Sequence, residues 1–261
     1  MDRKLTEFSG KLKDALGADL VSFIVYGSAV TGEFYNHSDF NTIIVLKESG
    51  PGQLKAMAGP VKKWVSGGQP VPMIFTRAEI SDSDDVFPME YLDIKENSTV
   101  LYGEDVFKKI KPSGRNLRLE IERELRSKLI RLKQNYILTG GRPSDVRNLM
   151  IRSVSSFIAI LKGILRLNDI KAPAKKKDAV EAAPAELKLN KQLFFDILSM
   201  KEGSKEIADG SVDAIFSDYM KELDLGHGLC LFLGLKIHFL DLKTEHTGDD
   251  ICREPADSHV I

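Results

Sequence analysis

The sequence predicts an α/β domain with a mixed β-sheet and flanking helices, followed by an all-α helical bundle. Short apolar, β-branched runs at 20–26 and 41–46 alternate with helical patterns in the first part of the chain. After Gly114 the strand signals stop and long helical periodicities begin. We expect three parts: an α/β domain over 1–112, a bundle over 113–243 and a flexible polar tail over 244–261.

Composition is that of an ordinary globular protein, with 43% hydrophobic and 29% charged residues in 261. The 37 basic and 38 acidic residues nearly cancel, so no nucleic-acid partner is expected. The two cysteines, Cys230 and Cys252, form no CxxC pair and are expected to be free thiols. The N-terminus has no signal-peptide pattern, and the apolar run 229–235 is too short for a membrane span. We expect a cytoplasmic protein with no membrane contact.

The first domain is expected to contain at least four strands. The two apolar runs above suit strands buried on both faces. Pro70 and Pro72 place the strand over 71–76 at an edge of the sheet or make its start irregular. The apolar segment 87–94 fits a helix or a strand. The other expected elements are helices at 3–16 and 52–66, a helical turn at 77–80 and a strand at 99–102.

The second half is expected to be helical throughout. The segment 157–165 is apolar on nearly every face, which is typical of the central helix of a bundle. The lysine- and proline-rich stretch 171–189 fits a loop or a short helix. The expected helices are 116–139, 143–167, 190–200 and 213–242.

The most informative motif is a Gly-Ser turn between the first strand and a short helix. Gly27 permits close backbone approach and Ser28 adds a hydroxyl donor, which suits a phosphate chain. Asp39 stands just before the second strand, and side chains 39 and 41 of an extended segment share a face. Two carboxylates there would hold magnesium beside the phosphates.

This pattern resembles the DNA polymerase β-like nucleotidyltransferase superfamily, and within it the kanamycin-type and minimal nucleotidyltransferases. VPMIFTRAEI (71–80) resembles their third strand and the short helix after it, and STVLYGED (98–105) resembles the strand that closes the catalytic domain. The resemblance covers about residues 20 to 105. It implies descent from enzymes that transfer a nucleotide from an NTP to a hydroxyl with magnesium.

The resemblance assigns phosphate binding to Gly27 and Ser28 and the first metal carboxylate to Asp39. Asn41 stands where the second carboxylate belongs, and Val71 or Met73 stands where the third belongs. An Asn carbonyl brings no charge and cannot act as a base, so Mg²⁺ would bind weakly and transfer would be impaired. The acids nearest in sequence that could compensate are Glu33, Glu79, Glu90 and Asp93.

We therefore expect a catalytically impaired protein, a candidate pseudoenzyme, that binds a nucleotide or another phosphate-bearing ligand at Gly27–Ser28. The alternative is an active magnesium-dependent nucleotidyltransferase that uses Asp39 and moves NMP to a small molecule or protein. A second alternative is a non-enzymatic module in which the helical half forms a homodimer or binds a protein partner. His37 could act as a base and Lys175–Lys177 could contact nucleic acid, but solvated surface is the simpler interpretation of both. Glu120, Glu122 and Glu124 could supply a catalytic base or form a solvated helix face.

Overall fold

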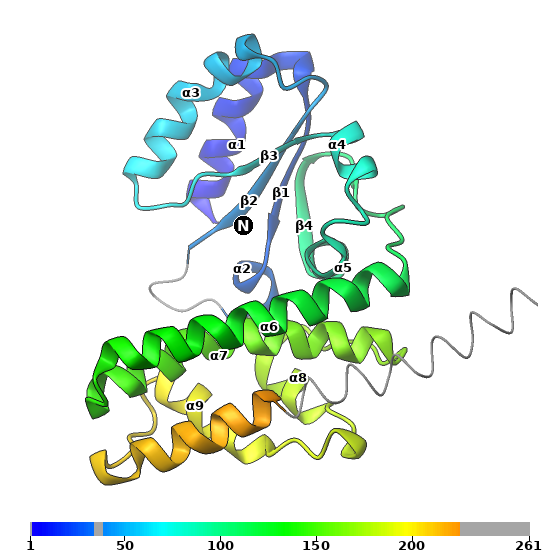
Figure 1. Cartoon of the computed structure of the whole chain (residues 1–261). Helices are drawn as coiled ribbons and strands as arrows, with labels where there is room; N and C mark the ends of the chain where they lie inside the picture. Colours follow the sequence, from blue (N-terminus) through cyan, green and yellow to red (C-terminus); the bar gives the residue numbers. More distant parts are fainter. Residues whose placement is uncertain (1, 34–38, 225–261) are drawn as a thin grey trace, which may run out of the picture.

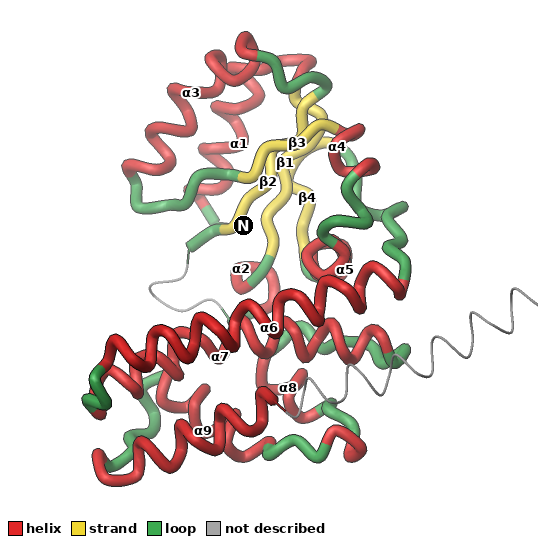
Figure 2. The backbone as a smooth tube through the Cα atoms, viewed as in Figure 1, coloured by secondary structure: helices red, strands yellow, loops and turns green. Residues whose placement is uncertain are grey.

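The computed structural model describes residues 2–33 and 39–224 of the chain. The expectations for His37, Cys230 and Cys252, for the end of the last helix and for the tail 244–261 lie outside these residues. Within the described part, an α/β half and a helical half are stacked end to end (Figures 1 and 2).

The sheet has four strands in the order β3-β2-β1-β4. β1 pairs antiparallel with β2 and β4, and β2 pairs parallel with β3, which confirms a mixed sheet. β3 is an edge strand and begins only after Pro72, because proline has no N–H to donate to a ladder. The strands are β1 Leu20–Tyr26, β2 Asn41–Leu46, β3 Met73–Thr76 and β4 Ser98–Gly103.

Helices cover both faces of the sheet. α1 (Arg3–Leu16) and α3 (Pro51–Ser66) lie on one face, and α4 (Arg77–Asp82) and α5 (Pro88–Glu96) lie on the other (Figure 1). Phe23 packs in the α1–α3 core, whereas its neighbour Ile24 packs in the α4–α5 core. This alternation confirms that β1 is buried on both faces.

The ambiguous segment around 87–94 is the helix α5, and it joins the two halves. Pro88 occupies its first turn, where a missing N–H costs nothing. Tyr91 and Ile94 pack under the sheet, while Met89 enters the core of the helical half. α5 therefore fixes the position of the sheet relative to the bundle.

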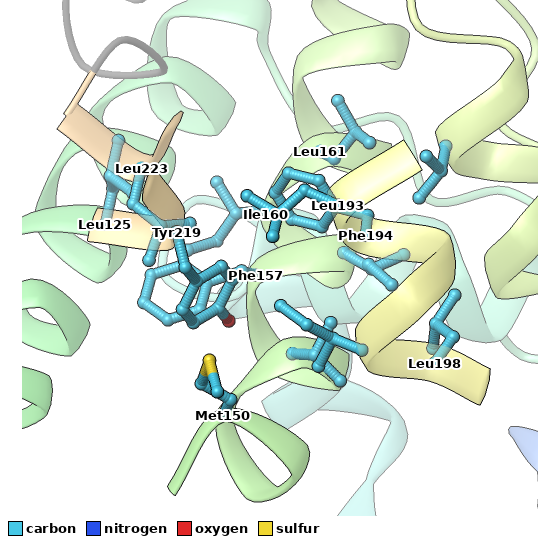
Figure 3. Close-up of a cluster of buried hydrophobic side chains, with 14 of the residues drawn as sticks. Leu125, Met150, Phe157, Ile160, Leu161, Leu193, Phe194, Leu198, Tyr219 and Leu223 are labelled. Atoms are coloured by element: carbon cyan, nitrogen blue, oxygen red, sulfur yellow. The ribbon is translucent and has the colours of Figure 1, made fainter. Parts of the chain in front are cut away.

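The helical half is built around α6 and α7, which run across the lower end of the sheet (Figure 2). Its core contains the buried α6 residues Leu117, Ile121, Leu125, Leu129 and Leu132. Tyr219 makes edge-to-face ring contacts there with Phe157 of α7 and Phe194 of α9 (Figure 3). The helices are α6 Gly114–Thr139, α7 Pro143–Leu167, α8 Lys176–Glu181, α9 Lys191–Lys201 and residues 212–224. Short 3₁₀ turns occur at Gly17–Asp19, Ala185–Leu187 and Asp209–Ser211.

α7 is the central helix that its apolar sequence predicts. By length and composition alone it could cross a bilayer, but 56% of its most apolar window is buried inside the protein. Contacts with α6, α8 and α9 account for this burial. The central helix of a bundle has the same composition for that reason.

Candidate functional site

A cleft of about 380 Å³ lies where the sheet meets the helical half. One wall comes from the end of β1, the four-residue helix α2 (Ser28–Thr31) and the start of β2, and it includes Gly27, Ser28 and Asn41. The opposite wall comes from α7 and α8. Figure 1 shows α2 between the sheet and the α6–α7 pair.

The Gly27 turn needs glycine for two reasons. Its φ is 77°, which side-chain-bearing residues rarely adopt. A Cβ here would also lie 3.1 Å from the Nδ2 of Asn41. The N–H groups of Val30 and Thr31 are the first to bond back to the Gly27 carbonyl, at 2.9 and 3.1 Å. The N–H groups of Ser28 and Ala29 precede them and have no acceptor within α2.

The structure brings three of the four predicted site residues together. Gly27, Ser28 and Asn41 all line the cleft, and Tyr26 and Asn41 are paired across β1 and β2. Asp39 is exposed and does not line the cleft. Its role as a metal ligand therefore remains a prediction.

Three of the four acids considered as substitutes line the cleft, and two of them are in ion pairs. Glu33 accepts hydrogen bonds from the Nζ and the backbone N–H of Lys176, at 2.7 and 2.8 Å. Asp93 accepts from Arg166 at 3.2 Å and from Asn97 at 3.0 Å. The fourth acid, Glu79, caps α4 through the backbone of Thr76 and is not in the cleft.

The remaining cleft acid, Glu90, is hydrogen-bonded to a buried second carboxyl, that of Glu120 on α6. Glu120 is only 5% exposed and accepts a 2.7 Å hydrogen bond from the backbone N–H of Met89. Burial, with a smaller contribution from Glu90, raises the pKa of Glu120 to about 8. At neutral pH Glu120 therefore keeps its proton and donates it to Glu90.

The alternative of a solvated helix face is thus wrong for Glu120. The neighbouring Glu122 and Glu124 form (i, i+4) ion pairs with Arg118 and Lys128 on the helix surface, as plain surface acids do.

The carboxylates that line the cleft do not form a suitable magnesium site. Mg²⁺ requires oxygen ligands in a nearly ideal octahedron, and it prefers charged ones that are free to bind it. Two of the cleft carboxylates are committed to cationic side chains, and the third is hydrogen-bonded to a protonated carboxyl. Among residues 2–33 and 39–224, no three His, Cys, Asp or Glu side chains are grouped to hold a metal ion.

The helical wall instead presents three cations: Lys162, Arg166 and Lys176. The Arg166 side chain is only 7% exposed and pairs with Glu96 at 2.7 Å as well as with Asp93. Lys176 opens α8, so the expectation of a solvated loop is wrong at this lysine.

Lys162 is the least compensated of these cations. Its Nζ donates to the carbonyl of Ala174 at 2.6 Å, and its nearest carboxylate oxygen, on Asp93, is 3.9 Å away. Burial lowers the pKa of Lys162, since it removes water from the ammonium. A charged residue inside the apolar run 157–165 was the sequence signal for this position. An anion in the cleft would supply the missing counter-charge.

Comparison with known proteins supports the fold. No protein-family model matches the sequence, and no curated protein matches it. One similar solved structure is that of spectinomycin adenyltransferase AAD(9) from Enterococcus faecialis with ATP and spectinomycin. It is 11% identical with a TM-score of 0.53, and the match covers 86% of this chain and 100% of that one. The chain therefore shares a nucleotidyltransferase-like fold, with a helical region after the sheet domain.

Proposed function

We propose that this chain uses its nucleotidyltransferase-like fold to bind a nucleotide or another phosphate-bearing ligand in the cleft, and that it transfers nucleotides poorly or not at all. Ser28 and the Gly27 turn would contact the phosphates from one side. Lys162, Arg166 and Lys176 would contact them from the other. The ligand would bind without magnesium.

The buried ammonium of Lys162 is the observation that carries this proposal. Withdrawing a lysine ammonium from water costs free energy, and the hydrogen bond to the Ala174 carbonyl offsets only part of that cost. A phosphate oxygen at hydrogen-bond distance would offset more of this cost, because it carries a charge opposite to that of the ammonium, which a carbonyl does not. Phosphate would also compete with Asp93 and Glu33 for Arg166 and Lys176.

Impaired transfer follows from what the cleft lacks. In-line phosphoryl chemistry depends on positioning and on charge stabilisation, which carboxylate-bound metal ions supply in this superfamily. In the cleft, Asn41 has no charge, and Glu33 and Asp93 already neutralise lysine and arginine side chains. The chain's residues can hold an anion, but they leave no free carboxylate pair to hold a metal.

Isothermal titration calorimetry with ATP, GTP, CTP and UTP tests the proposal. We expect at least one of them to bind in EDTA, and we expect Ser28→Ala and Lys162→Met each to weaken binding by about tenfold. Lys109→Met, which removes an exposed lysine outside the cleft, is the matched control and should leave binding unchanged. An absence of heat with every nucleotide would rule out a nucleotide as the ligand and favour a partner-binding module.

An active magnesium-dependent enzyme is the second candidate, and Glu90 is the observation that favours it. Among the acids that line the cleft, Glu90 is the one outside any ion pair, and the hydrogen bond from Glu120 orients the Glu90 carboxylate. An acid held in this way could accept a proton from an attacking hydroxyl. The assay is magnesium-dependent release of pyrophosphate from an NTP with candidate hydroxyl acceptors. Turnover abolished by Glu90→Gln and by Asp39→Ala would establish the enzyme and overturn impaired transfer.

A further inference from the structure

The exposed side of α6 carries a regular row of cationic and aliphatic residues. α6 runs along the outside of the helical half, in front of α7 (Figure 1). Leu119, Ile130 and Ile137 are 56%, 57% and 75% exposed on it. Arg123, Arg126 and Lys133 are exposed between them. We call these six residues the α6 row.

The spacing within the α6 row is that of a helix–helix contact. Successive members are separated by 4, 3, 4, 3 and 4 positions in the sequence. This alternation keeps side chains on one line of an α-helix and is the repeat by which two helices pack along each other. The row is about 27 Å long at 1.5 Å per residue. The opposite side of α6 is already occupied, because Leu117, Ile121 and Leu125 are buried in the bundle core.

The cations of the α6 row differ from their neighbours in their ion pairs. Among the described residues, Arg123, Arg126 and Lys133 form no salt bridge, whereas Arg118 and Lys128 on the flanks of the same helix are paired with Glu122 and Glu124. The acids of α6 are thus used beside the row and not within it. A partner that lies on this row must therefore bring negative charge.

We propose that the α6 row is a docking surface for an acidic amphipathic helix of a partner protein. The helix would place aliphatic side chains against Leu119, Ile130 and Ile137. Its Glu or Asp side chains would lie against Arg123, Arg126 and Lys133. Arginine suits this role because its aliphatic stem packs while its planar guanidinium pairs with carboxylate. This inference does not depend on the cleft ligand.

Three other occupants fit the row less well. A second copy would bring the same three cations to the contact and no acid to pair with them. A membrane-surface helix separates its aliphatic and basic residues onto different faces, whereas here they alternate along one line. Nucleic acid would gain nothing from the three aliphatic side chains, and the row offers no aromatic ring for bases to stack on.

The test uses the full-length chain and a synthetic acidic helix of about four heptads whose packing face alternates Leu and Glu. A peptide of identical composition with that face shuffled is the second probe. Fluorescence anisotropy should show salt-sensitive binding of the first peptide and at least tenfold weaker binding of the second. The double variant Arg123→Gln/Arg126→Gln and the double variant Leu119→Gln/Ile137→Gln should each weaken binding about tenfold or more.

The matched control is Lys55→Gln/Lys62→Gln, which removes two exposed lysines seven positions apart on α3 and should leave binding unchanged. Equal binding of both peptides would mean that the row attracts acidic peptides without recognising a helix face, and it would overturn the proposal. The same conclusion follows if neither peptide binds. Row-dependent binding to anionic vesicles or to single-stranded RNA in place of the peptide would also overturn it.

Discussion

The two walls of the cleft come from halves of the chain that present different groups to it. The α/β wall presents the Gly27 turn, Ser28 and the uncharged Asn41. The helical wall presents Lys162, Arg166 and Lys176 to the same space. The difference teaches that the positive charge in this cleft can come from side chains of the second half instead of from metal ions bound by the first.

Salt bridges across the cleft connect its two walls. Lys176 of α8 bonds to Glu33, which follows α2, and Arg166 of α7 bonds to Asp93 and Glu96 of α5. Carboxylates and cations thus meet between the halves, where they both shape the cleft and join its walls. Variants that alter one wall at a time separate the two roles.

The largest expected effect comes from Arg166→Met. It leaves Asp93 and Glu96 without their shared arginine, and it should lower the free energy of unfolding by about 2–3 kcal/mol. The cost stays below that of a fully buried pair because both carboxylates are about one-third exposed. Urea denaturation measures it.

Arg147→Met is the control for that prediction, because it removes an α7 arginine whose partner, Asp209, is largely exposed. It should cost under about 1 kcal/mol. If both variants lost the same free energy of unfolding, the ion pairs between the halves would stabilise the fold no more than an exposed ion pair does.

The second prediction concerns Glu120 and pH. The folded chain binds the Glu120 proton up to about pH 8, whereas the unfolded chain releases it near the ordinary value of 4.5. Native Glu120 therefore costs stability progressively as pH rises from about 5 through 8. Gln keeps the bond from Met89 N–H, donates to Glu90 and cannot ionise. Glu120→Gln should be close to neutral at pH 5 and increasingly stabilising relative to the native chain as the pH rises to 8.5.

Thermal unfolding followed across pH 5 to 9 tests this prediction. Glu122→Gln on the surface of the same helix should change stability by a pH-independent amount over that range. An unchanged slope in Glu120→Gln would show that Glu120 is ionised in the folded protein.

The last comparison separates the Gly27 turn from an ordinary glycine at a helix end. Gly140 is in the left-handed helical region, where alanine should cost about 1 kcal/mol. Gly27 has φ 77° and ψ −145°, a region that residues other than glycine rarely adopt, so alanine there should cost more. A Cβ at Gly140 meets nothing within 4 Å, whereas one at Gly27 displaces the Asn41 amide. Gly27→Ala should therefore also weaken nucleotide binding in calorimetry, and Gly140→Ala should not. Equal affinities would place the ligand away from this turn.

Most of the sheet could be predicted from the sequence because its signals are local. β1 and β2 coincide with the apolar runs 20–26 and 41–46, and Pro72 correctly indicated an edge strand with an irregular start. The segment around 87–94 stayed ambiguous because a short apolar run has no decisive period. Its helical form matters, since α5 carries Glu90 and Asp93 into the cleft.

The helical wall could not be predicted, because its contacts are not local. Glu33 and Lys176 are 143 positions apart, and nothing in either neighbourhood specifies the other. Lys162 was visible as a lone charge inside an apolar run, but the run alone does not say which side of the helix faces a cleft. The turn was therefore predictable, and the charges opposite it were not.

The dissociation constant of ATP, measured by calorimetry in EDTA and again in excess MgCl₂, tests most directly whether side chains replace metal ions. We predict values that agree within about threefold, and a loss of about tenfold in both buffers for Lys162→Met. Affinity that appears only with magnesium, and that Asp39→Ala removes while Lys162→Met leaves it intact, would contradict this assignment. The cleft would then be a metal site.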